Sequence, residues 1–398
     1  MVIPKFIIKN NMQKSTKTGL YFRDLISDND LEQISRNLTG SSQYTVEFVN
    51  NDYKDDFLDE SYNKGRLGIL HFKSKVYYIC FSDFSNAGRN SAVQSVPTAY
   101  NMFYLNKFVD KELVFYFLPS SGNNATNYHK FMYRLMATAG FKFLNTPSEL
   151  IDKLQPFNSI DDIILARKEN SNRNSSNSAT YILKNNNHNY DIYGKTYGAN
   201  KYETSLICYA VSSLATRNDK ITLYQYNEKD LKELPKSSLL VLKKMGNLRI
   251  INIDDELEKQ ELRKTNSIRS PRFNARLLDR FGDKKCVLCG CEINEIIQGA
   301  HIWPVSEIKK RKDLSITEQL EFATDGENGL WMCQNHHKLF DSHIIRLTEN
   351  GQLKYMDQIP EAYKSYINSV TTIFCLPPKI VTRDFRHYIR LRNSLLQD

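Results

Sequence analysis

The sequence has no long run of apolar residues. No segment approaches the roughly 20 consecutive apolar residues that cross a bilayer, and the apolar stretch within residues 1–10 is too short for the hydrophobic region of a signal peptide. The chain is also poor in cysteine, and four of its 7 cysteines fall between residues 286 and 333 instead of being spread out as in a disulfide framework. We therefore expect a cytoplasmic protein with no membrane partner.

A complete phosphate-binding loop is missing as well. Gly194-Lys195-Thr196 resembles the end of such a loop, but Asn189 stands where the required glycine would be, five residues before Gly194. Without that glycine the backbone cannot wrap around a phosphate in the usual way. We therefore interpret the segment as a β-turn and not as a nucleotide site.

Positive charge, by contrast, is in excess. The 54 Lys and Arg residues outnumber the 45 Asp and Glu residues, which gives a net charge of +9. A basic balance favours an anionic partner, most often nucleic acid. With 398 residues the chain is long enough for two or three domains, each with its own core.

Helical and strand-like patterns are mixed along the chain, which predicts an α+β, multidomain architecture. The Asn/Ser-rich segment 169–178 cannot support a packed core, so it marks a candidate boundary. We interpret residues 86–95 as a polar loop. The predicted divisions are an N-terminal α+β domain at 1–168, a second α+β unit at 179–256 and a C-terminal domain at 268–398.

Two basic helices are predicted in the C-terminal third. In the first, at 268–282, apolar residues recur at every fourth position. The same helix carries a second stripe that consists of Arg272, Arg276 and Arg280. The other helix, at 382–396, carries Arg386 and Arg390. Both arginine sets would suit contact with a phosphate backbone, and a solvated or surface-packed helix face is the alternative interpretation of each.

The cysteine cluster has the spacing of a metal site. Cys286 and Cys289 are separated by two residues, as are Cys333 and His336, and 43 residues lie between the two pairs. Each pair can offer two ligands to one ion, and four such ligands complete a structural zinc site. Cys291 leaves some choice among the cysteines. His337 could replace His336, although the equal spacing favours His336.

Groups suited to phosphodiester hydrolysis lie between and just after these pairs. A neutral histidine can accept a proton from water near neutral pH, and His301, at the end of a predicted short strand, could do so. Asn328 could fix the loop that carries His301. His337 and Asp341 are four residues apart on a predicted helix, so that both could bind one hard cation.

Several motifs follow one another between residues 268 and 350. They are Arg-x2-Arg-Phe-x2-Arg-Leu-Leu, Ala-His-Ile-x-Pro, Asn-Gly-Leu and His-x-Leu-Phe-Asp. Their order resembles the HNH, or ββα-metal, nuclease family, and in particular the McrA-like branch found among restriction endonucleases. The resemblance implies that His301 is a general base, that Asn328 orients it and that His337 binds a divalent ion, usually Mg²⁺.

The chain departs from the family pattern in one position. Many members of the family have Asp or His directly before the general base, as a metal ligand, whereas this chain has Ala300. The second ligand must then come from elsewhere, with Asp341 as first candidate and Asp325 or His343 as alternatives.

The leading functional hypothesis is a sequence-specific restriction endonuclease that cuts double-stranded DNA. Nuclease domains of this kind contact the backbone and carry little base readout, so residues 1–168 would recognise the target, and residues 179–256 would serve recognition or dimerisation. Cutting both strands favours a homodimer on a palindromic site. The alternatives are a modification-dependent endonuclease that flips a methylated base into a pocket and a non-catalytic zinc-stabilised DNA-binding protein.

Overall fold

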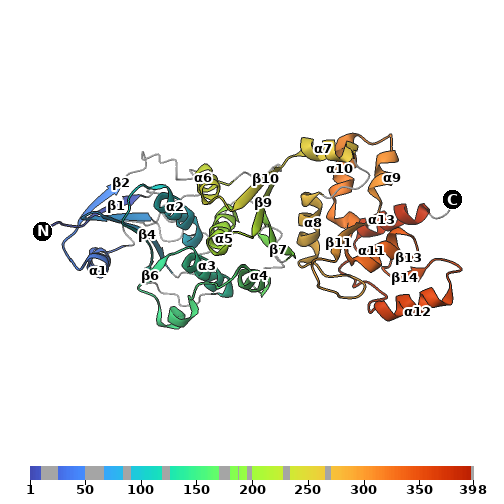
Figure 1. Cartoon of the computed structure of the whole chain (residues 1–398), viewed down its shortest axis with the longest axis horizontal. Coiled ribbons are helices and arrows are strands. Elements are labelled where there is room, and N and C mark those ends of the chain that lie inside the picture. The colour runs from blue at the N-terminus through green and yellow to red at the C-terminus, as the bar shows by residue number, and fades with distance from the viewer. Residues whose placement is uncertain are drawn as a thin grey trace. The chain divides into compact units, whose positions relative to one another are not determined.

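The chain forms two compact units, each with its own core (Figure 1). Unit 1 comprises Met1–Asn170, Gly194–Gln225 and Lys229–Ile250, and unit 2 comprises Ser171–Tyr193, Tyr226–Glu228 and Ile251–Asp398. The computed structural model describes residues 1–9, 26–49, 67–83, 91–118, 126–169, 180–186, 188–194, 200–226, 234–264 and 270–395. This grouping differs from the three successive segments predicted from the sequence. That those segments are separate domains remains a prediction.

Unit 1 is built around a mixed six-stranded sheet with the strand order β2-β1-β3-β4-β5-β6. Its elements are β1 (Lys5–Lys9), α1 (Asp28–Thr39), β2 (Thr45–Val49), β3 (Leu67–Phe72), β4 (Lys75–Asp83), α2 (Ser91–Leu105), β5 (Lys111–Leu118), α3 (Asn127–Thr138), β6 (Lys142–Leu144), the 3₁₀ helix η2 (Ser148–Lys153), α4 (Ile160–Glu169), α5 (Asn200–Leu214), β9 (Lys220–Tyr226), α6 (Lys236–Met245) and β10 (Leu248–Ile253). The last residue of β9 and the residues of β10 from Ile251 onward already belong to unit 2. The pairs β4–β5 and β5–β6 are parallel, and helices connect them. This part of the unit therefore consists of βαβ connections, which the sequence patterns did not predict.

Helix α2 corrects one sequence prediction. Residues 91–95 were expected in a polar loop, but they form the first turns of α2. Residues 84–90, including Arg89, lie outside the described residues. The buried face of α2 explains the difference, because the Tyr100 ring stacks on the Tyr209 ring of α5 at 4.2 Å between centroids. Asn101 also bonds the Tyr209 hydroxyl at 2.6 Å. Packing against distant residues thus selects a helix that the local composition does not suggest.

Unit 2 contains two β-hairpins, a ββα element and several helices. Its elements are β7 (Tyr181–Asn186), β8 (Asn189–Gly194, ending at the unit boundary), α7 (Asp255–Lys264), α8 (Pro271–Phe281), β11 (Ile297–His301), α9 (Val305–Lys310), α10 (Ile316–Thr324), the 3₁₀ helix η3 (Gly326–Asn328), β12 (Gly329–Cys333), α11 (Gln334–Asp341), β13 (Ile345–Leu347), β14 (Leu353–Tyr355), α12 (Glu361–Val370) and α13 (Arg383–Ser394). Strands β7 and β8 pair in antiparallel fashion, as do β13 and β14. The predicted terminal helix is confirmed as α13, which begins after the capping residue Thr382.

The ββα element positions the candidate site. Strands β11 and β12 are antiparallel, with Ile297 opposite Cys333 and His301 opposite Gly329. Helix α11 follows β12 directly. Every residue of β12 is buried, so the strand forms the centre of this unit. Among the helices in the described parts of the chain, none has both the length and the apolar character needed to cross a membrane.

Candidate active site and metal centre

The four predicted zinc ligands lie together in unit 2. Their ligand atoms all lie within 4.8 Å of one another. The Nδ1 atom of His336 is 3.5 Å from the Sγ atom of Cys286 and 3.2 Å from that of Cys333, and the Sγ atoms of Cys289 and Cys333 are 3.8 Å apart. A tetrahedron with zinc–sulfur bonds of about 2.3 Å has edges of about 3.8 Å, so the cluster fits a zinc ion.

Two turns bring these ligands together. After Cys286 the chain reverses through Gly290, whose φ of +68° lies in the left-handed region that glycine adopts readily. Cys333 ends β12, and His336 follows in the first turn of α11. The Nε2 atom of His336 lies 3.0 Å from the Thr371 hydroxyl, so that Nδ1 is left to face the three thiols. A hydrogen bond on the far ring nitrogen fixes the tautomer and orientation of a metal-binding histidine.

His301 ends β11 and is held on two sides. Its Nε2 atom lies 2.8 Å from the carbonyl oxygen of Ala323. A carbonyl oxygen can only accept, so Nε2 carries the proton and Nδ1 keeps a free electron pair. The imidazole also stacks on the Phe273 ring, at 4.0 Å between centroids and 8° between planes. Burial lowers the pKa of His301 to about 4, so the ring is neutral at neutral pH.

Asn328 contacts the loop that follows His301. Its side chain is fully buried and bonds the backbone of Trp303 twice, accepting from the N–H at 2.7 Å and donating to the carbonyl at 3.1 Å. It also donates to the carbonyl of Phe322 at 3.0 Å. The asparagine thus joins the start of β12, the loop after β11 and the end of α10.

His337 and Asp341 face each other on α11. The Nε2 atom of His337 is 3.2 Å from a carboxylate oxygen of Asp341, and its Nδ1 atom is 3.2 Å from the amide oxygen of Gln298. Burial alone would raise the pKa of Asp341, but the hydrogen bond and charge of His337 outweigh it and hold that pKa below its usual value. The carboxylate is therefore charged and can serve as a cation ligand.

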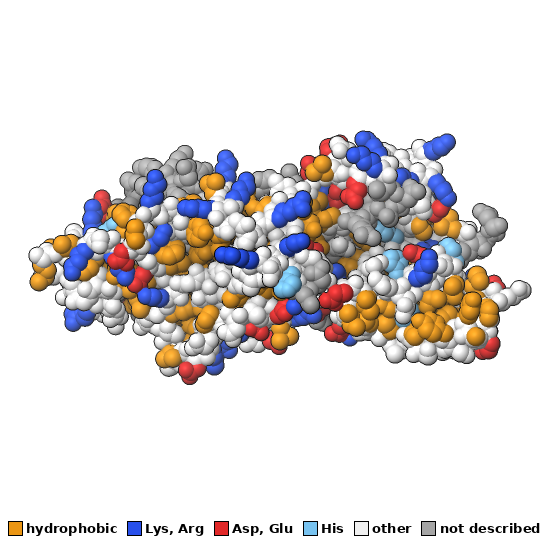
Figure 2. All heavy atoms as spheres, viewed as in Figure 1, with side chains coloured by type: hydrophobic (Ala, Val, Ile, Leu, Met, Phe, Trp, Pro, Cys, Tyr) orange, Lys and Arg blue, Asp and Glu red, His pale blue; other side chains and the backbone are white. Residues whose placement is uncertain are grey.

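A cavity of about 1160 Å³ joins these groups within unit 2. Its lining includes His301, Gln298, Lys284, His337, Asp341 and His343. Histidine side chains reach the surface of this unit on the face that Figure 2 displays. The cavity thus brings together a neutral imidazole, a carboxylate and further histidines, which are the groups that metal-assisted hydrolysis requires.

The candidates for a second ligand of the catalytic metal differ in position. Ala300 is fully buried and does not line the cavity. Asp325 accepts a hydrogen bond of 2.6 Å from the Tyr388 hydroxyl and is likewise absent from the cavity lining. Asp341 and His343 both line it.

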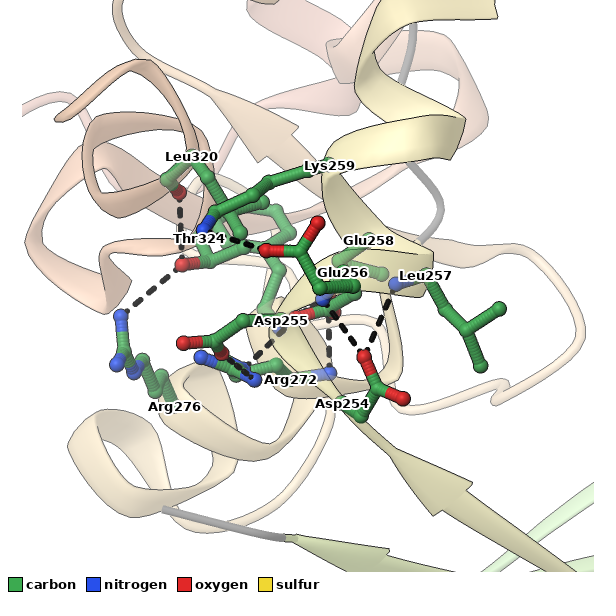
Figure 3. Close-up of polar contacts among 12 residues, drawn as sticks. Asp254, Asp255, Glu256, Leu257, Glu258, Lys259, Arg272, Arg276, Leu320 and Thr324 are labelled. Carbon is green, nitrogen blue, oxygen red and sulfur yellow. Dashed lines mark hydrogen bonds and ion pairs between the residues drawn. The ribbon is translucent and has the colours of Figure 1, made fainter. Parts of the chain in front are cut away.

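The arginines of α8 do not form one exposed stripe. Arg272 is buried and contacts two acidic residues of α7 (Figure 3), at 2.5 Å from Asp255 and 2.8 Å from Glu258. Arg280 pairs with Glu327 at 2.9 Å and donates to the carbonyl of Gly329 at 2.9 Å. Arg276 is half-buried and donates to the Thr324 hydroxyl at 3.1 Å. The prediction that this stripe faces a phosphate backbone is therefore wrong for Arg272 and Arg280, whose guanidinium groups join elements within unit 2.

The arginines of α13 divide in the same way. Arg386 and Arg390 are exposed, and Arg390 lies 3.4 Å from a carboxylate oxygen of Glu349. Arg392 is buried and donates to the carbonyls of Ile302, at 2.9 Å, and of Phe340. The first two can meet a phosphate backbone, whereas the third ties the loop after β11 to α11.

Sequence reasoning missed three residues of this site. Gln298 contacts His337, but no motif marks it. Lys284 lines the cavity, and burial lowers its pKa; it stands in sequence only as one more basic residue near the cysteines. Phe273 is visible in sequence as part of an apolar stripe, but its contact with His301 is not.

Comparison with known proteins addresses the same part of the chain. A search of curated proteins found no match. Residues 286–348 match the family model described as HNH endonuclease. These residues contain the four candidate zinc ligands, both strands of the ββα element and α11. This match identifies residues 286–348 of the chain as an HNH endonuclease domain.

Proposed function

We propose that the chain is a metal-dependent endonuclease that hydrolyses phosphodiester bonds in double-stranded DNA. The observation that carries the proposal is the cavity in which a neutral His301 and the pair His337–Asp341 line the same space. A phosphodiester needs a base for the attacking water and positive charge near the phosphate oxygens. The cavity supplies the base from its own residues. It also supplies ligands for a cation, which would provide the positive charge.

The roles follow from the contacts. His301 accepts the proton of water on Nδ1, because Ala323 occupies its Nε2 side. Asn328 orients the loop that follows His301. His337 and Asp341 hold a divalent ion such as Mg²⁺, which neutralises charge on the phosphate when bound. The zinc centre is structural, because four protein ligands leave it no open position.

We further propose that the enzyme is a sequence-specific restriction endonuclease and that unit 1 recognises the target. Among the residues that the structure describes, those lining the cavity all belong to unit 2. The nuclease domain by itself would grip the DNA backbone without reading bases. Cutting both strands requires two such domains, so we propose a homodimer on a palindromic site.

The test is digestion of plasmid DNA with Mg²⁺ by the full chain and by His301→Ala. We expect the wild type to cut and the variant to retain its fold and its zinc while losing cleavage. Full activity of the variant would reject the assigned base. Failure of the wild-type protein to cut any substrate that it binds would favour a DNA-binding protein without catalysis.

A second digestion separates the two kinds of restriction enzyme. Genomic DNA is prepared with and without methylation, incubated with the enzyme and Mg²⁺, and sequenced at the new ends. Cleavage of unmethylated DNA at one recurring sequence supports the sequence-specific proposal. Cleavage confined to methylated DNA assigns the modification-dependent class instead.

A further inference from the structure

We propose that Phe273 is a positioning residue that, together with Ala323, fixes the orientation of the His301 imidazole. The proposal rests on the proposed function, because it deepens the role given to His301. Phe273 itself is buried, at 2% exposure, and acts through the histidine.

Two contacts restrict the imidazole in different ways. A stacked ring at 4.0 Å and 8° fixes the plane of the imidazole. The contact between Nε2 and the Ala323 carbonyl, at 2.8 Å, fixes which edge of that plane faces the protein. With plane and edge both fixed, Nδ1 has a single direction. A base held in one direction does not populate orientations in which it cannot accept the proton.

Two glycines make room for the Phe273 ring. Gly299 lies two residues before His301 on β11, and Gly329 on β12 stands directly opposite His301. Both glycines therefore belong to the face of the hairpin that carries His301. A Cβ atom on Gly329 would lie 2.5 Å from the Cζ atom of Phe273, and one on Gly299 would lie 2.9 Å from its Cε1 atom. Leu277 shares this space, because its Cδ1 atom would lie 2.7 Å from a Cβ on Gly299 and its Cδ2 atom 2.7 Å from a Cβ on Gly329. A side chain at either position would therefore displace the Phe273 ring, the Leu277 side chain or both.

Backbone conformation does not explain these glycines. Gly329 has an extended φ of −143°, which any residue adopts, and Gly299 has no positive φ. What both positions require is the absence of a side chain. A glycine inside a strand often marks such a close approach.

The start of α8 anchors Phe273 from the other side. The Ser270 hydroxyl accepts from the N–H of Phe273 at 3.3 Å and is itself bonded to the buried Glu258 carboxylate. Arg272, the preceding residue, is paired with Glu258 and Asp255 of α7 (Figure 3). The first turn of α8 therefore has little freedom, and Phe273 presents a fixed surface to the imidazole.

The test uses Phe273→Leu, which keeps an apolar side chain and removes the aromatic face. We expect folding and zinc content to be kept, kcat to fall about 10- to 100-fold and KM to stay unchanged. In the NMR spectrum, the ring protons of His301 should move downfield, because they lose the shielding of the stacked ring. Phe281→Leu, on the same apolar stripe of α8, is the matched control and should change neither kcat nor the chemical shifts of the His301 ring protons.

A double variant separates positioning from packing. Gly329→Ala should destabilise the protein, because the new methyl group meets the Phe273 ring. Combining it with Phe273→Leu should recover part of that stability, because the ring is gone while Leu277, whose Cδ2 atom would lie 2.7 Å from the new methyl group, remains. The value of kcat should stay low. Recovery of both stability and kcat would overturn the proposal, since the ring would then matter only for packing.

The outcomes also distinguish this inference from the proposed function. Wild-type kcat in Phe273→Leu, or unmoved His301 signals, would overturn the inference while His301→Ala still tests the base. If His301→Ala cuts normally, the role of His301 as base fails, and if the wild-type protein cuts no substrate, the proposed endonuclease function fails. The NMR shift would then still report whether Phe273 holds the imidazole.

Discussion

The side-chain oxygen of Asn328 accepts a hydrogen bond of 2.7 Å from the backbone N–H of Trp303, and its amide nitrogen donates to the carbonyl of the same residue at 3.1 Å. An asparagine that bonds both polar groups of one residue acts like a neighbouring strand. It continues the pairing of β11 with β12 for two residues beyond His301. The direction of the chain after His301 is thereby fixed.

Replacing Asn328 with alanine should therefore affect stability and catalysis together. Buried polar groups of Trp303 and Phe322 would lose their partner, which we expect to lower the free energy of unfolding by about 1–3 kcal/mol. The loop after His301 would loosen, so kcat should fall. Urea unfolding and plasmid nicking measure the two effects.

Asn328→Asp and Asn350→Ala complete this test. Aspartate keeps the size and the acceptor but cannot donate to two carbonyl oxygens, so its cost should equal or exceed that of alanine. Asn350 is exposed in the turn between β13 and β14, and its variant should behave as wild type. An Asn328→Ala protein with unchanged kcat would show that the loop does not depend on this side chain.

The zinc centre predicts a clear difference between two cysteines. Cys286→Ser should lose its zinc and lower the melting temperature by about 10 °C or more, because structural zinc contributes directly to folding. Cys291→Ser should keep both, because Cys291 is not in the ligand cluster. Metal analysis of the purified proteins and thermal unfolding decide this. Zinc loss in the Cys291 variant would mean that the ligand set has been assigned wrongly.

The environment of His301 predicts an unusual titration. Burial lowers its pKa to about 4 from the ordinary 6.5, so the neutral form, which can act as base, persists as the pH falls from 7 to 5. An NMR titration without Mg²⁺ should place the midpoint of the His301 ring protons near pH 4, with His301→Ala to identify the signals. A midpoint near 6.5 would contradict the burial of this ring.

Local patterns were sufficient to predict the ββα element and the clustering of Cys286, Cys289, Cys333 and His336. The two pairs of ligands lie in tight turns, and the strand ending at His301, the strand beginning at Gly329 and the helix after Cys333 each have a local signal. Contacts with distant residues were not predictable in this way. Phe273 stacks on a residue 28 positions later, and nothing near either of them in sequence specifies that pairing.

The arginines of α8 illustrate the same limit. Their spacing correctly indicated an amphipathic helix, but spacing does not say what a guanidinium group meets. Arg280 is paired with Glu327, and Arg272 with two residues of the preceding helix. These partners come together only when unit 2 folds, so a stripe that looks suited to DNA becomes part of the core.

This division of the arginines predicts different outcomes for two sets of variants. Arg386→Gln with Arg390→Gln should leave stability unchanged, weaken DNA binding and reduce its salt dependence by about one ion per lost phosphate contact. Arg272→Met should instead lower stability by about 3–5 kcal/mol, because Glu258 would remain as a buried charge that has lost an ion-pair partner. DNA binding measured over a range of salt concentrations, together with urea unfolding, separates the two. If the Arg386 and Arg390 variants bind DNA like the wild type and a folded Arg272→Met protein does not, α8 and not α13 meets the phosphate backbone, and Arg272 must leave its acidic partners in the complex.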